Sequence, residues 1–90
     1  MKIYISGAIT DNPNYKKQFA EAEKKLIAEG HSVINPAKKN KGFEYKEYID
    51  LGLIELMHCD AIYLLDGWME SRGSRLEFQY ALTIDMKVYL

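Results

Sequence analysis

The segment best suited to chemistry is Gly73-Ser74-Arg75-Leu76-Glu77, a glycine-containing stretch at the start of a predicted helix. The helical neighbours of Glu77 on its own face are mostly apolar: Gly73, Tyr80, Ala81 and Ile84. We therefore expect Glu77 to point inward in the first turn. A fixed carboxylate there suits cleavage of a glycosidic bond, because it can attack or stabilise an electron-poor sugar carbon. A second interpretation stays open, since Ser74 and Glu77 also match the S-x-x-E capping box.

Other candidates stand at one predicted helix and at the ends of two predicted strands. Asp50 is a mid-helix aspartate flanked by Leu53, Ile54 and Met57, and it either reaches solvent or binds a sugar hydroxyl. Asp66 ends an apolar strand and belongs either to a ligand site or to an ordinary Asp-Gly turn. Gly7 follows the first strand, where a ligand can approach the backbone closely. The residues around it form neither a G-x-G-x-x-G fingerprint nor a Walker motif, so we expect no nucleotide cofactor.

The elements that must position these residues alternate along the chain. Strands are predicted at 2–6, 32–34, 60–65 and 87–90. Helices are predicted from apolar spacing over 15–26, with Gly30 as the stop signal, over 45–56 and from about Ser74 to Ile84. This order predicts an α/β fold, a small Rossmann/flavodoxin-like three-layer sandwich with a four-stranded parallel sheet and about three helices. Ligands of such sheets bind beyond the carboxyl ends of the strands, so we expect a site built from the loops after Ser6, Ile34 and Leu65.

Length and composition narrow the function classes. The 90 residues predict one domain over 1–90, and the net charge of −1 gives no reason to expect nucleic acid or an anionic membrane as partner. The lone Cys59 cannot form an internal disulfide, which fits a reducing, cytoplasmic location. We expect it to be a buried small hydrophobe, and we expect no metal site. The small core, the seven tyrosines and the last strand, which leaves a sheet edge to cover, predict a homodimer or higher homo-oligomer.

Three blocks in order along the chain resemble the nucleoside 2-deoxyribosyltransferase-like superfamily, which includes small phage and bacterial domains of unknown function. The blocks are Ile3-Tyr4-Ile5-Ser6-Gly7-Ala8-Ile9, Asp50-Leu51 and Gly73-Ser74-Arg75-Leu76-Glu77-Phe78-Gln79-Tyr80-Ala81. The characterised members they are similar to are nucleoside deoxyribosyltransferases and deoxynucleoside 5′-monophosphate N-glycosidases. The resemblance implies that the first block lines a nucleoside pocket, that Asp50 binds the sugar hydroxyls and that Glu77 is the nucleophile.

The resemblance implies an N-glycosidase or deoxyribosyltransferase acting on a small nucleoside or nucleotide through Glu77. It implies substrate contacts for seven further residues: Tyr4, Gly7, Ala8, Ile9, Asp66, Gly73 and Ser74. Asp66 is also a candidate to protonate the leaving base. The chain departs from the pattern at Thr10, where the glycosidases tend to carry arginine, and at Ser71, where the transferases carry aspartate. It also stops at Leu90, whereas the characterised enzymes continue past the fourth strand. Two other functions therefore stay open, a non-catalytic nucleotide-binding module and a small structural or interaction subunit.

Overall fold

The computed structural model describes residues 1–38 and 45–90, with side chains described over 1–38 and 51–90. Its elements alternate as predicted: β1 (Lys2–Ser6), α1 (Tyr15–Ala28), β2 (Ser32–Ile34), α2 (Tyr45–Met57), β3 (Ala61–Leu64), α3 (Arg72–Thr83) and β4 (Lys87–Tyr89). Two short 3-10 helices, η1 (Pro36–Lys38) and η2 (Trp68–Glu70), follow β2 and β3. Within these residues, no helix is long and apolar enough to cross a membrane.

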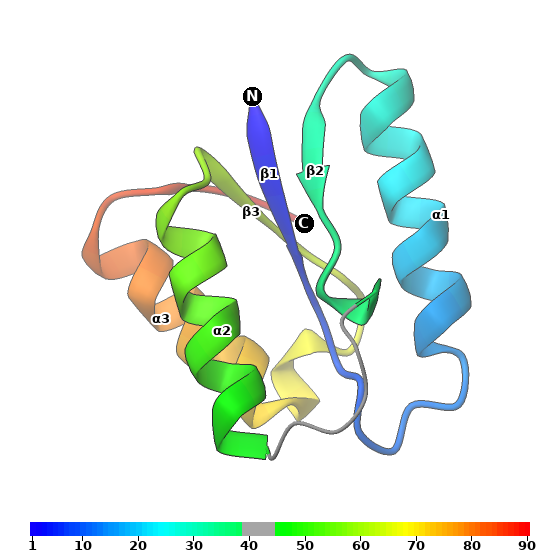
Figure 1. The fold of residues 1–90 in the computed structure, drawn as a ribbon, viewed down its shortest axis with the longest axis vertical. Coiled ribbons are helices and arrows are strands. Elements are labelled where there is room, and N and C mark those ends of the chain that lie inside the picture. The colour runs from blue at the N-terminus through cyan, green and yellow to red at the C-terminus, as the bar shows by residue number, and fades with distance from the viewer. Residues whose placement is uncertain (39–44) are drawn as a thin grey trace.

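The four strands form one parallel sheet in the order β2-β1-β3-β4, which confirms the predicted flavodoxin-like α/β fold. Helix α1 covers one face of the sheet, and α2 and α3 lie together on the other (Figure 1). The chain leaves β1 toward β2 in one direction and later returns to β3 on the opposite side of β1. The order of strands therefore reverses between β1 and β3, and a ligand site is expected at the carboxyl ends of these two strands.

Strand β1 supplies both layers of the core, because successive side chains of a strand point to opposite faces. Ile3 and Ile5 pack on the α1 side, in a buried cluster completed by Phe19, Ala22, Leu26, Ala61 and Leu65. Tyr4 packs on the other side, in a cluster with Leu56, Cys59, Ile62, Leu64 and Ala81. Ser6 points to this second side as well, since it hydrogen-bonds to side chains of α3. One face of β1 is therefore apolar, and the other carries two hydroxyl groups.

The ends of two helices test the sequence-based boundaries. Gly30 has a φ of 93°, and the backbone N–H of His31 donates to the carbonyl of Leu26 (3.1 Å), so the predicted glycine stop of α1 is confirmed. The start of α3, predicted at about Ser74, lies two residues earlier in the structure. The helix begins at Arg72, and the hydroxyl oxygen of Ser71 caps it by accepting from the backbone N–H of Ser74 (3.2 Å). Glu77 consequently lies in the second turn of α3 rather than the first.

Candidate active site

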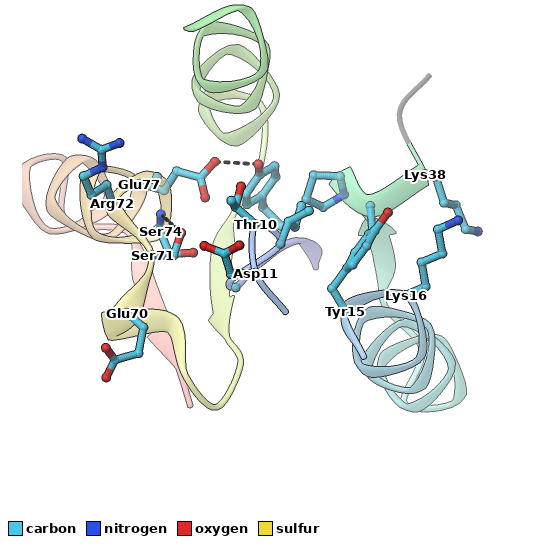
Figure 2. A pocket seen from close by; sticks show the side chains of 16 residues that line it. Thr10, Asp11, Tyr15, Lys16, Lys38, Glu70, Ser71, Arg72, Ser74 and Glu77 are labelled. Atoms are coloured by element: carbon cyan, nitrogen blue, oxygen red, sulfur yellow. Dashed lines mark hydrogen bonds between the residues drawn. The ribbon is translucent and has the colours of Figure 1, made fainter. Parts of the chain in front are cut away.

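A cavity of about 720 Å³ opens at the carboxyl ends of the strands, where the sequence predicted a site. Its walls come from the loop after β1, the start of α1, η1 after β2, and the segment from the end of η2 into α3 (Figure 2). Its volume falls in the usual range for small-molecule pockets. The lining residues are Tyr4, Gly7, Ile9, Thr10, Asp11, Tyr15, Lys16, Pro36, Ala37, Lys38, Glu70, Ser71, Arg72, Gly73, Ser74 and Glu77.

The carboxylate of Glu77 is held in this cavity by two hydroxyl groups from β1. The Tyr4 hydroxyl donates to Oε2 at 2.7 Å, and the Ser6 hydroxyl donates to Oε1 at 2.7 Å. The residue is 9 % exposed, so the carboxylate is largely withdrawn from water yet still borders the cavity. Glu77 is therefore fixed in position at the wall of the cavity.

An ionised Glu77 carboxylate would set the direction of the hydrogen bonds around it, because it only accepts. The hydroxyl oxygens of Ser6 and Ser74 are 3.0 Å apart, and both residues are buried. Ser6 has a single hydroxyl proton, which it gives to Glu77, so Ser74 supplies the proton for the contact between the two serines. The proton donors thus run from Ser74 through Ser6 to the carboxylate, with Tyr4 as the second donor. A carboxylate that only accepts completes this network.

Tyr4 is a permanent donor in this arrangement. Burial raises the pKa of its phenol far above the ordinary value, and the negative charge of Glu77 and the hydrogen bond to it raise this pKa further. The phenol therefore keeps its proton throughout the physiological pH range. It holds Oε2 of Glu77 in place without adding a charge to the site.

Gly52 brings helix α2 unusually close to the same carboxylate. A Cβ atom built on Gly52 would lie 2.6 Å from Oε2 of Glu77 and 2.8 Å from the Tyr4 hydroxyl oxygen. Real Cβ atoms essentially never lie closer than 3.0 Å to such an atom, so a side chain here requires the pair or the helix to move. Glycine inside a helix costs about 1 kcal/mol relative to alanine, and this close approach is a physical reason for its presence.

Six of the predicted site residues do line the cavity, namely Tyr4, Gly7, Ile9, Gly73, Ser74 and Glu77. Ala8 and Asp66 are not among the lining residues. Asp66 is exposed, and its backbone carbonyl accepts from the side chain of Gln18 (2.9 Å). Asp50 belongs to α2, but its side chain lies outside the described residues.

The capping-box interpretation of Ser74 and Glu77 is wrong. A capping box needs its serine at the N-cap, and Ser71 holds that position in α3. Ser74 lies inside the first turn, where its backbone N–H donates to Ser71 and its hydroxyl meets Ser6. Glu77 is bound to β1 instead of to the helix start. Ser74 and Glu77 have the S-x-x-E spacing because both lie on the face of α3 that contacts the sheet.

Three residues that bear on the position or chemistry of Glu77, namely Ser6, Gly52 and Asp11, were not singled out as site residues from the sequence, although Ser6 belongs to the first of the three blocks. Ser6 has a simple signal, because it stands two positions after Tyr4 and so shares its face of the strand. Gly52 has a weaker one, an isolated glycine within a predicted helix. Asp11 lines the cavity in the loop after β1, and only the path of that loop places it there.

Comparison with known proteins extends over the whole chain. The family model described as a domain of unknown function (DUF4406) matches residues 1–90. No match to a functionally curated protein was found.

Proposed function

Because the chain belongs to the DUF4406 family, whose description names no activity, we propose its function from the site: cleavage of the N-glycosidic bond of a nucleoside or nucleotide by Glu77. One observation carries the proposal. A largely buried carboxylate borders a cavity of suitable size and is held there by two hydroxyl donors from the central strand.

In the proposed reaction an oxygen of Glu77 attacks C1′ of the sugar. The bond between C1′ and the base nitrogen breaks, its electron pair leaves with the base, and the base takes up a proton. A glycosyl ester on Glu77 results, and water or a second base then takes the sugar and restores the carboxylate. Tyr4 and Ser6 serve this chemistry by fixing the carboxylate, since a correctly oriented nucleophile removes much of the entropic part of the barrier.

The substrate class is supported by the sequence resemblance and by the place of the site. The blocks that resemble nucleoside deoxyribosyltransferases and deoxynucleoside monophosphate N-glycosidases include Tyr4, Gly7, Gly73 and Glu77, all of which border one cavity. That cavity lies where the strand order reverses, the usual ligand position in open parallel sheets. The membership of this chain in that superfamily is part of the proposal.

The test incubates the protein with a panel of 2′-deoxynucleosides and their 5′-monophosphates and measures the released base by chromatography. We expect the wild-type protein to release the base from at least one of them, and Glu77→Ala and Glu77→Gln to lose about 100-fold or more of the rate. Glu29→Gln is the matched control, because Glu29 is exposed at the far end of α1. Equal rates in Glu77→Ala and the wild type would rule out the proposed nucleophile. Saturable nucleotide binding without base release would support the non-catalytic alternative instead.

A further inference from the structure

The loop after β1 carries a second carboxylate into the cavity that holds Glu77. Asp11 is one of the lining residues, and Figure 2 shows its carboxylate directed into the cavity toward the side formed by Ser71, Ser74 and Glu77. The residue is exposed. Within the described part of the chain its carboxylate makes no hydrogen bond or ion pair, so both oxygens can accept from water or from a ligand.

The backbone holds Asp11 in this place through a closed turn. The backbone N–H of Asn12 donates to the carbonyl of Ile9 (3.2 Å), which puts Asp11 at the third position of the turn with a φ of 62°. Glycine, asparagine and aspartate are the residues that tolerate this left-handed conformation. The turn therefore fixes the direction in which the Cα–Cβ bond of Asp11 leaves the loop.

Side-chain hydrogen bonds fix the loop to the rest of the fold. The amide nitrogen of Asn12 donates to the carbonyl of Ala8 (2.9 Å) and to the side-chain oxygen of Gln18 on α1 (3.0 Å). The amide nitrogen of Gln18 in turn donates to the carbonyl of Asp66 after β3 (2.9 Å). This brace joins the loops that follow the two central strands, and it therefore positions Asp11 relative to the cavity.

We propose that Asp11 is the general base that activates the water in the second half of the reaction. The inference rests on the proposed function, in which Glu77 carries the glycosyl group as an ester. The water oxygen bonds to C1′, the bond from C1′ to the Glu77 oxygen breaks, and its electron pair returns to the carboxylate. The proton of the water passes to Asp11, which later releases it to solvent. Two carboxylates facing one sugar carbon are the general arrangement of glycoside hydrolysis.

Asp11 is better placed for this role than Asp66, which the sequence suggested as the group that protonates the leaving base. Asp66 is absent from the cavity lining, and only its backbone carbonyl takes part in the brace. A base must reach the reacting water, and Asp11 borders the same cavity as the nucleophile. The proposal makes the protein a hydrolase, because it assigns the second carboxylate to water.

Asp11→Asn tests the role with little change to the fold, since asparagine tolerates the same backbone conformation. Asp85→Asn is the matched control. Asp85 is an exposed aspartate with a φ of 58° in the turn before β4, and it is not among the lining residues of the cavity. Both variants should melt within a few degrees of the wild-type protein.

The experiment uses the deoxynucleoside or monophosphate that the wild-type protein hydrolyses fastest, and it follows base release from the first turnover. For Asp11→Asn we expect a burst of about one base per subunit and then steady turnover reduced about 100-fold or more. Azide has no proton to lose and needs no base. Added azide should therefore restore base release and give a glycosyl azide. Asp85→Asn should match the wild type in all respects.

Two results overturn the assignment while leaving the proposed function intact. One is wild-type turnover by Asp11→Asn, and the other is loss of the burst together with the steady rate and no rescue by azide. The second result would show that Asp11 positions the substrate and does not activate water. A wild-type protein that releases no base at all would overturn both the proposed function and the role of Asp11.

Discussion

Replacement of Gly52 by alanine probes the close approach of α2 to the Glu77 carboxylate. Helix propensity alone predicts a stabilisation of about 1 kcal/mol, because alanine is favoured over glycine inside a helix. The structure predicts the opposite sign. The new Cβ would lie 2.6 Å from Oε2 of Glu77, an oxygen that Tyr4 holds in place, and 2.8 Å from the hydroxyl oxygen of Tyr4 itself.

The expected cost has two sources. An extra methyl group in a packed site costs about 1 to 3 kcal/mol. If the carboxylate moves away, the hydrogen bond from Tyr4 to a charged acceptor is weakened, and such bonds contribute about 1.5 to 3 kcal/mol. After the gain in propensity, we expect Gly52→Ala to lower the free energy of unfolding by about 2 kcal/mol or more. For a domain of this size that corresponds to a fall in Tm of roughly 8 to 16 °C.

A double-mutant cycle of Gly52→Ala with Glu77→Ala, followed by urea unfolding, measures how much of the cost depends on the Glu77 side chain. If the clash with the carboxylate is responsible, Gly52→Ala should cost at least about 1 kcal/mol less in the Glu77→Ala background than in the wild type. Stabilisation by Gly52→Ala in the wild-type background would refute the reasoning. An equal cost in the two backgrounds would show that the carboxylate is not the group displaced.

Two further predictions concern the residues that fix Glu77 and the start of α3. Folding raises the pKa of Tyr4, chiefly through burial, so the folded protein keeps this proton above pH 10.0 while the unfolded chain loses it. Its contribution to stability is complete below that pH and falls above it by up to about 1.4 kcal/mol per pH unit. In urea unfolding, Tyr4→Phe should lower the free energy of unfolding by about 1.5 to 3 kcal/mol at neutral pH. The variant should also lose less stability than the wild type as the pH rises above 10.0. Tyr89→Phe, at an exposed tyrosine, should show neither effect. Ser71→Ala removes the cap of α3 and should cost about 1 kcal/mol, a fall in Tm of roughly 4 to 8 °C, while Ser71→Asn should retain most of the stability. An unchanged Tm in Ser71→Ala would contradict the assigned helix start.

The fold was predictable from local patterns. Each signal that predicted an element depends only on residues close together in the chain. These signals are the apolar run of β3, the helical spacing of Phe19, Ala22 and Leu26, and the stop at Gly30, and the structure has the predicted element at each place. Cys59 is buried as expected, with its thiol donating to the carbonyl of Glu55 (3.4 Å). Alternation of strands and helices then restricts the sheet to few topologies.

The site was predictable only in part, because its contacts join residues far apart in the chain. Glu77 could be placed on the inner face of α3 from helical spacing, but spacing cannot show that its partners are Tyr4 and Ser6 on β1. The start of α3 was misplaced because two serines three residues apart, Ser71 and Ser74, both suit an N-cap. Asp11 depends on the path of a loop, which propensities do not determine.

The two faces of β1 also bear on how the chain finds its register. A slip of one residue in the pairing of β1 would turn Ile3 and Ile5 toward Glu77 and drive the hydroxyls of Tyr4 and Ser6 into the apolar layer beneath α1. The slipped sheet would bury a carboxylate without donors and would lose packing on both sides at once. The two hydroxyl residues that hold Glu77 therefore also favour the correct alignment of β1 with its neighbouring strands. Substitutions made to alter the site are expected to affect folding yield as well as chemistry.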